Sequence, residues 1–453
     1  MPALPLRGRY KWLLLVAALG LLAIQAAPTP TNASATRAQP ACGAWSIVPT
    51  SGTALDLGRF KGVAATSHSN VWAIGSASDQ NDLLARWDGT GWSLEPHPQP
   101  GSFFNDFQDI ATSSEGDAWI VGAYSSSRAS RPSMAETSTL TQRLQGGRWK
   151  LVPSPNHPNK PQSYLNSIAP IGPDDVWAVG NAGGEDIVLR WNGTEWTFTP
   201  VPVVAQGGYL FDVAGTSPGD VWAVGVYTTD KFTQAARILH WNGADWQLMP
   251  NPDLPSAEYN LQGVAALTPD DAWAVGSRTE NGRTLTLIEH WDGSAWTVVP
   301  SPNTTRTENT LHRVTATAPD DVWAVGRTGT GGDAQPLMLH FDGTAWANVT
   351  LPRVNARFSE LVSIATVPGS TEIWAVGAYA DANSREHTLA MRYRPCAEGG
   401  GTTGEGVPGG GIPGMPATGA NGNPPLAARV VATLLHDSVA ALLALIRQLV
   451  GLF

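Results

Sequence analysis

Seven copies of a short tryptophan phrase run through this chain at a nearly constant spacing. In order they read VWAIG, AWIVG, VWAVG, VWAVG, AWAVG, VWAVG and IWAVG. The first and last of these tryptophans, Trp72 and Trp374, lie six repeats apart, so the period is about 50 residues. A period of this length indicates that each copy folds into the same small unit and packs on its neighbours.

One repeat, residues 165–200, shows what the unit is. Turn sequences, GPDD after the first apolar run and NGTE after the third, divide the repeat into short β-prone segments. We expect its four strands at 165–170, 176–180, 187–191 and 196–199. Four antiparallel strands joined by tight turns make one propeller blade. The sequence therefore predicts an all-β fold, a seven-bladed β-propeller with four antiparallel strands in each blade.

The tryptophans occupy fixed positions in the repeat. Of the 19 in the chain, only Trp12 and Trp45 stand outside the second-strand, third-strand and fourth-strand positions. Residues on the two sides of a tight hairpin face each other, where aromatic pairs pack well. Burying one indole contributes about 4–6 kcal/mol before entropy is subtracted. We therefore expect the tryptophans to hold blades together rather than to form sugar-stacking platforms.

The seventh repeat contains three strand segments and no fourth. The missing strand lies at the other end of the chain, because 45–49 (WSIVP) matches 296–300 (WTVVP), a fourth strand. The N-terminal strand is therefore expected to close the last blade and remove two exposed sheet edges.

The only two cysteines, Cys42 and Cys396, flank this closing blade. Cys396 follows Tyr393 by three residues, and Cys42 precedes Trp45 by three. A disulfide between them would replace the hairpin turn that the chain break removes. Such a bond would contribute on the order of 5 kcal/mol through loop entropy.

The N-terminal sequence predicts that the protein is exported. Arg7, Arg9 and Lys11 precede an apolar run at 12–27 and then small residues, the layout of a secretory signal peptide, so residues 1–35 are expected to be a leader. An uncleaved membrane anchor is the alternative, and on either interpretation the remainder is secreted or extracellular.

Three further segments follow the leader. Residues 43–395 form the propeller, 397–425 a Gly/Pro-rich linker, and 426–453 an amphipathic, largely hydrophobic helix. The MPATG sequence at 415–419 is similar to a cell-wall sorting signal. For 415–453 we leave three fates open: contact with a membrane surface, sorting to the cell wall, or packing on a partner.

The expected ligand-binding surface is one end of the central channel. The loops between second and third strands, and those between blades, vary in length and gather on the same face. The candidate binding residues, which enter the first strands near that face, are Lys61, Asp109, Asn166, Asp212, Tyr259, Gln262, His312 and Arg313. This mixed polar set fits a carbohydrate or protein ligand, and an ordinary channel lining around water is the alternative.

No catalytic, metal or cofactor site emerges. The Asp-Asp pairs at 174–175, 270–271 and 320–321 repeat in turns, where turn chemistry explains them. The histidines His240, His290 and His340 occupy one position in separate blades, too far apart to share a metal ion. The net charge of −10 and the thin spread of the 28 lysines and arginines argue against a nucleic-acid partner, which would need a basic face.

The repeat resembles those of kelch and galactose-oxidase-type propellers, and more closely those of secreted bacterial propellers with VWAVG…HWDGxxW repeats. The resemblance covers about 45–395 and implies the fold rather than an activity. The tail of the sialidase Asp-box is also similar to 88–92 (DGTGW), but only Arg313 is available where a sialidase needs an arginine cluster.

Three hypotheses for the function follow. The first is a monomeric, non-catalytic binding or scaffold module outside the cell, which needs no cofactor. The second is a glycoside hydrolase or lyase that acts on a polysaccharide. The third is a structural component of the cell surface.

Overall fold

The computed structural model describes residues 43–50, 55–77, 82–126, 136–204, 207–231, 233–252, 254 and 258–396. The predicted leader, linker and C-terminal helix, together with Cys42, lie outside the described residues. Within the described part, there is no helix with the length and hydropathy that a membrane span requires.

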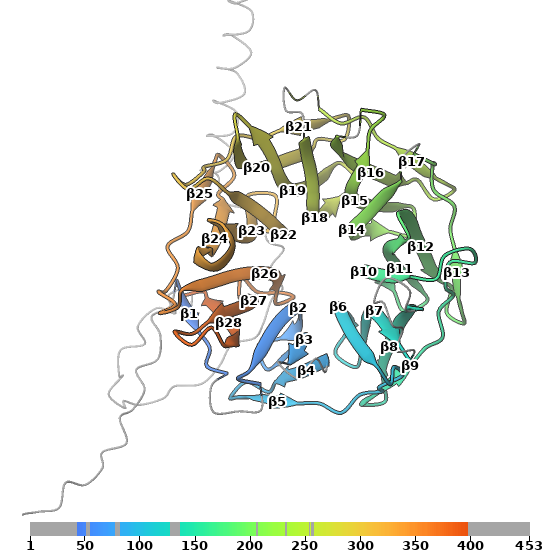
Figure 1. Ribbon diagram of the computed structural model, residues 1–453, viewed down its shortest axis with the longest axis horizontal. Helices are drawn as coiled ribbons and strands as arrows, with labels where there is room; N and C mark the ends of the chain where they lie inside the picture. Colours follow the sequence, from blue (N-terminus) through green and yellow to red (C-terminus); the bar gives the residue numbers. More distant parts are fainter. Residues whose placement is uncertain are drawn as a thin grey trace, which may run out of the picture. The chain divides into compact units, whose positions relative to one another are not determined.

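Seven four-stranded antiparallel sheets are arranged around a central axis (Figure 1). Blade 1 consists of β2 (Gly58–Ser67), β3 (Asn70–Ala77), β4 (Asp82–Trp87) and β5 (Trp92–Leu94). Blade 2 consists of β6 (Phe104–Ser114), β7 (Asp117–Ser125), β8 (Ser138–Gln145) and β9 (Arg148–Leu151). Blade 3 consists of β10 (Tyr164–Gly172), β11 (Asp175–Ala182), β12 (Glu185–Trp191) and β13 (Trp196–Phe198).

The remaining blades follow the same order. Blade 4 consists of β14 (Gly208–Ser217), β15 (Asp220–Thr228), β16 (Gln234–Trp241) and β17 (Trp246–Leu248). Blade 5 consists of β18 (Glu258–Thr268), β19 (Asp271–Glu280), β20 (Arg283–Trp291) and β21 (Trp296–Val298). Blade 6 consists of β22 (Asn309–Ala318), β23 (Asp321–Thr328), β24 (Gln335–Phe341) and β25 (Trp346–Asn348), with the 3-10 turn η2 (Gly331–Asp333) before β24. Blade 7 combines β26 (Phe358–Thr366), β27 (Ile373–Ala380) and β28 (Glu386–Arg394) with β1 (Ala44–Ile47).

In blades 1, 3, 4, 5 and 6, the first residue of the hairpin between the third and fourth strands holds the turn. In blade 3, Asn192 Oδ1 accepts hydrogen bonds from the backbone N–H groups of Thr194 and Glu195, at 2.9 and 3.0 Å. Asp88, in the segment similar to a sialidase Asp-box, accepts bonds from Thr90 and Gly91 in the same way. These bonds lower the pKa of Asp88 to about 2, so this carboxylate holds a turn.

Indole rings form the contacts between blades, as predicted. Trp119 of β7 is fully buried and meets the edge of Trp196 from blade 3, with ring centroids 5.3 Å apart. The same contact recurs around the ring in the pairs Trp72–Trp149, Trp177–Trp246, Trp222–Trp296, Trp273–Trp346, Trp323–Trp45 and Trp374–Trp92. All of these tryptophans are buried, as expected for rings that hold neighbouring blades together.

A cationic or imidazole side chain lies over each second-strand tryptophan. In blade 4, His240 stacks on Trp222 at 4.0 Å and contacts Asp220 through Nε2 at 2.7 Å. His290 and His340 make equivalent contacts with Asp271 and Asp321. The second aspartate of each Asp-Asp pair therefore fixes a stacked side chain, in addition to its place beside a turn. The described residues contain no cluster of metal-ligand type.

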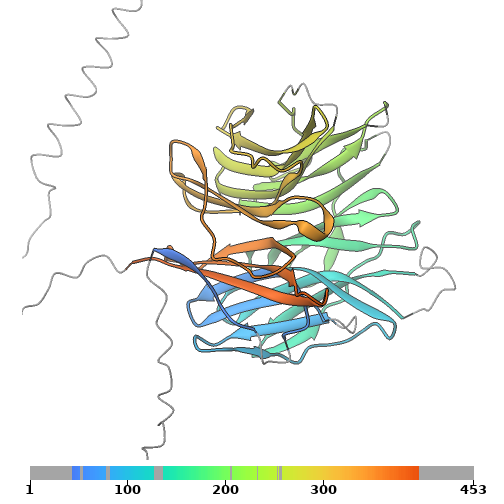
Figure 2. The same ribbon diagram turned by 60° about the vertical axis from the view of Figure 1, so that its left-hand side comes forward.

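The N-terminal strand closes the ring, as predicted. β1 pairs antiparallel with β28, with Trp45 opposite Tyr393. In both views the first strand (blue) lies beside the last one (red-orange) (Figures 1 and 2). Trp45 thereby takes the position that Trp196 has in blade 3, because Trp196 lies opposite Trp191.

The disulfide stays a prediction, because Cys42 lies outside the described residues. Its neighbour Gly43 donates a backbone hydrogen bond to Arg394 at 2.7 Å, and a Cβ on Gly43 would lie 3.2 Å from Cys396 Sγ. We expect non-reducing peptide mapping of the protein to recover residues 42 and 396 in one cross-linked peptide. Free thiols at both positions would contradict the proposed bond.

Candidate functional site

Every first strand contains a β-bulge at the same point. In β10, for example, the pairing with β11 skips Asn166 between Leu165 and Ser167. A bulge re-aims the extra residue away from the regular alternation of the strand. The seven bulged residues are Lys61, Gln108, Asn166, Phe211, Gln262, His312 and Val362. The repeat thus brings one side chain per blade to the axis of the propeller.

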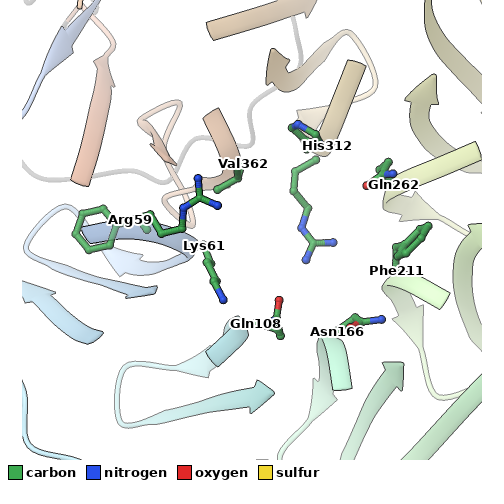
Figure 3. A pocket seen from close by; sticks show the side chains of 10 residues that line it. Arg59, Lys61, Gln108, Asn166, Phe211, Gln262, His312 and Val362 are labelled. Atoms are coloured by element: carbon green, nitrogen blue, oxygen red, sulfur yellow. The ribbon is translucent and has the colours of Figure 1, made fainter. Parts of the chain in front are cut away.

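These seven residues line a cavity of about 300 Å³, together with Arg59, Phe60 and Arg313 (Figure 3). Lys61, Gln108 and Asn166 reach it from one side, and Gln262 and His312 from the other. The cavity lies toward the N-terminal ends of the first strands, where the loops of variable length gather. Its position agrees with the face that the sequence singled out.

The predicted site residues fall into three groups. Those that line the cavity are Lys61, Asn166, Gln262, His312 and Arg313. Asp109 and Asp212 lie one position further along their strands, next to the bulged residues, and are buried below the lining. Tyr259 is not in the lining and packs against the apolar core between blades 4 and 5. Binding by any of them stays a prediction.

Five lining residues were missed: Arg59, Phe60, Gln108, Phe211 and Val362. For three of them a signal was present, because Gln108, Phe211 and Val362 stand two residues before the recurring aliphatic residue of the first strand, as Lys61 does. Phe211 and Val362 did not fit the expectation of a polar ring. Arg59 and Phe60 carry no repeated pattern that would have identified them.

A buried network crosses from blade 6 to blades 2, 3 and 4 below the cavity. Arg313 Nη1 lies 2.5 Å from Asp212 Oδ1, and Arg313 Nη2 lies 3.5 Å from Asp109 Oδ2. Ser167 Oγ contacts both carboxyl groups, at 2.6 Å from Asp212 and 2.7 Å from Asp109. The two aspartates also accept backbone N–H bonds from Ile168 and Val264. The network therefore joins five blades, blades 2 to 6, at the axis.

The network favours the neutral form of Asp109. Ser167 has a single hydroxyl hydrogen, and an ionised carboxylate can only accept, so one of the two acids must donate to Ser167 Oγ. Burial raises the pKa of Asp109, the Asp212 charge adds to this rise, and Arg313 opposes it. The guanidinium of Arg313 lies closer to Asp212 than to Asp109.

The other charged groups of the lining are paired within the protein. Lys61 bonds to Asp106, and Arg59 lies 3.1 Å from Glu360 and 2.7 Å from Glu386. Burial lowers the pKa of His312 to about 4, helped by the nearby guanidinium groups, so His312 is neutral at pH 7. The cavity therefore presents little uncompensated charge.

The amide side chains leave acceptors free. Gln108, Asn166 and Gln262 use their NH₂ groups on Asp106, the Leu210 carbonyl and Asn260 respectively. Among the described residues, none of the three amide oxygens has a hydrogen-bond donor. The cavity thus offers carbonyl acceptors from blades 2, 3 and 5 to a ligand that donates hydrogen bonds.

Comparisons with known proteins place this arrangement in a widespread fold. No family model matches the chain, and no curated protein matches it. Among solved structures, YCF48 from Cyanidioschyzon merolae is similar with a TM-score of 0.50 and 15% identity, over 78% of this chain and 99% of that one. A structure of a polysaccharide lyase described as PL25 ulvan lyase is similar with a TM-score of 0.50 and 11% identity, over 76% and 95%.

A second YCF48 structure, bound to a D1 peptide, gives a TM-score of 0.49 at 14% identity, over 78% of this chain and 97% of that one. At such identities the likeness shows the propeller fold alone. The resemblance to kelch and galactose-oxidase propellers therefore stays a prediction at the level of the repeat.

Proposed function

We propose that this chain is an extracellular, non-catalytic binding protein whose ligand enters the central cavity from the loop-rich face. The ligand is a carbohydrate or a protein segment that presents several uncharged hydrogen-bond donors. Export is proposed from the leader-like residues 1–35, and retention at the cell surface from residues 415–453.

The free amide oxygens carry this proposal. Gln108, Asn166 and Gln262 come from separate blades and line one cavity, and their side-chain carbonyl oxygens have no donor among the described residues. Sugar hydroxyls and peptide N–H groups are donors of the required kind. Because the cations of the lining are already paired, a neutral ligand is favoured over a strongly charged one.

The placement of the carboxyl groups favours binding over turnover. A general acid or base must come within hydrogen-bond reach of the reacting atoms. Asp109 and Asp212 are both buried, do not line the cavity, and are bonded to Ser167 and Arg313.

One observation supports a hydrolase or lyase as the second candidate. Burial raises the pKa of Asp109, while Asp212 pairs with Arg313, and two carboxyl groups in unlike surroundings form the usual acid and base of such enzymes. A movement of Arg313 would be needed to expose them. Loss of polysaccharide turnover in Asp109→Asn and Asp212→Ala would support this candidate.

The binding proposal predicts the effect of shortening the free amides. Gln108→Ala and Gln262→Ala should each weaken binding of a carbohydrate or peptide identified on glycan and peptide arrays by about threefold to tenfold, because each removes one net hydrogen bond. Isothermal titration calorimetry measures the change, with Gln247→Ala, an exposed residue of β17, as the control.

Unchanged affinity in both cavity variants would overturn the proposed site. Catalytic turnover of the bound polysaccharide would favour the second candidate instead.

A further inference from the structure

The boundary between blades 1 and 2 departs from the repeat in two ways, and both departures face the same pocket. This pocket has a volume of about 440 Å³. Its apolar part is formed by Trp72, Trp149, Leu144, Pro96 and Pro98, and its polar part includes Arg86, Arg148, His97, Glu95 and Glu115. The lining includes the first turn and the last hairpin of blade 2, whereas the central cavity lies among the first strands.

The first departure is the loss of an aromatic ring. In the other six blades, the third strand supplies Trp87, Trp191, Trp241, Trp291, Phe341 or Tyr393, which packs on the tryptophan of the preceding blade. In blade 2 this position is Leu144. Among the described aromatic rings of blade 2, Trp72 therefore pairs with Trp149 alone, with ring centroids 5.4 Å apart. The smaller side chain leaves room for the pocket beside these rings.

The second departure concerns the cation stacked on the tryptophan. In blades 2, 3 and 7 an arginine in this position is held by a carboxylate through two parallel bonds. In blade 3, for example, Arg190 bonds to Asp175 through Nε at 2.7 Å and through Nη2 at 3.0 Å. The carboxylate both neutralises the guanidinium and occupies its donor edge.

Blade 1 lacks that carboxylate, because Asn70 stands in its place. Asn70 Oδ1 accepts from Arg86 Nε at 2.9 Å, and its NH₂ group points at Thr66 and the Glu115 carbonyl. Among the described residues, Arg86 makes no ion pair, and its Nη2 has no acceptor. Among the described side chains that stack on second-strand tryptophans, Arg86 is the arginine without a carboxylate partner, so its guanidinium can bind an anionic ligand.

We propose that this pocket binds a hexuronate, the carboxylated sugar ring of an acidic polysaccharide. The carboxylate of the sugar bonds to Arg86, in the position where blades 2, 3 and 7 have an aspartate or glutamate of the protein. Arg148 lines the same pocket. Glu95 and Glu115 accept bonds from ring hydroxyls, and the C–H face of the ring packs on the prolines, Leu144 and the indole edges. An acidic peptide offers the carboxylate but fewer donors for the two glutamates, so we favour the sugar. This site is separate from the proposed central site.

The proposal can be tested by giving blades 1 and 2 the residues that the other blades carry at these two positions. Asn70→Asp should give Arg86 an internal carboxylate, and Thr66 can donate to the new oxygen as Thr216 donates to Asp220 in blade 4. Leu144→Trp should fill the pocket with the ring that blades 1, 3, 4 and 5 carry. Both variants follow patterns the fold already contains, so we expect them to remain folded.

Titration calorimetry of the full chain with sodium D-glucuronate and with a trimer of β-1,4-linked glucuronate measures binding. Each variant should weaken it by about tenfold or more, since a charge-assisted bond or the pocket itself is lost. Lys150→Gln, an exposed lysine on β9, should leave the affinity unchanged. A melting temperature at or above that of the unmodified chain shows that the variants are folded.

Three outcomes would overturn the proposal. Undiminished glucuronate binding in folded Asn70→Asp would show that Arg86 is not the anchor. Equal binding of glucose would show that the carboxylate is not recognised. Binding of tetraglutamate without binding of either glucuronate would assign the pocket to acidic peptides.

Discussion

Replacing Glu289 with leucine should raise the free energy of unfolding, and the gain should grow between about pH 5 and pH 8. Glu289 lies in β20 with no exposed surface, and neither carboxyl oxygen has a hydrogen-bond partner among the described residues. The same position holds Leu189, Leu239 and Leu339 in blades 3, 4 and 6, all fully buried. Leucine therefore suits the packing between blades at this point.

The pH dependence follows from the pKa of Glu289, which burial raises from 4.5 to about 8. Above pH 4.5 the unfolded chain releases this proton, whereas the folded chain keeps it until about pH 8. The folded state binds more protons in this window, so stability decreases as the pH rises, by about 1.4 kcal/mol per pH unit at most. The total loss at pH 8 is on the order of 4 kcal/mol.

Urea unfolding at pH 5 and at pH 8 measures the effect. Glu289→Leu should gain about 1–3 kcal/mol at pH 5, from removal of an unpartnered polar group, and more at pH 8. Glu289→Gln should lose the pH dependence while keeping the unpartnered group. Equal pH slopes for the unmodified chain and Glu289→Gln would contradict this account.

Replacing Trp45 with alanine should destabilise the propeller by about 3–5 kcal/mol, as much as the same change at an internal blade junction. Trp45 belongs to a strand of four residues near the start of the propeller, yet it is buried and lies 5.7 Å from Trp323 and 5.8 Å from Tyr393. Its removal leaves a cavity at the one junction that the chain closes with its N-terminal strand.

Trp196→Ala is the matched comparison, because Trp196 holds the same position in blade 3. Leu94→Ala, at a half-exposed residue of β5, should change the free energy of unfolding by less than about 0.5 kcal/mol. The three variants are compared by urea unfolding with Cys396 left in its native state. A Trp45→Ala protein as stable as the unmodified chain would show that β1 does not contribute to closure.

Much of the fold was predictable because the repeat fixes both the local elements and their partners. The tryptophan phrases identify each second strand, and the turn residues mark the hairpins on either side. Trp45 could be assigned to blade 7 from sequence because its neighbours match a fourth strand, and a propeller must pair its edges. The aromatic positions likewise predicted the junctions, since rings at fixed strand positions meet in every blade.

The candidate site was predictable only in part, because a β-bulge breaks the alternation of side chains along a strand. Lys61 and Asn166 line the cavity, whereas Asp109 and Asp212, each one position after a bulged residue, lie beneath it. Sequence alternation cannot show which of two adjacent residues a bulge aims inward.

At the junction of blades 1 and 2, Asn70 and Leu144 are visible in the sequence as departures from the repeat. The unpaired guanidinium of Arg86 and the space beside Leu144 lie in the same pocket. The sequence does not show this, because it depends on how blades 1 and 2 pack against each other. The sequence by itself determined the number of blades, the strands of each and the closure, because these follow from local patterns repeated along the chain. Only the tertiary structure decided which side chains reach the axis, which acids are buried and where charge stays unpaired, because these depend on contacts between residues far apart in the sequence.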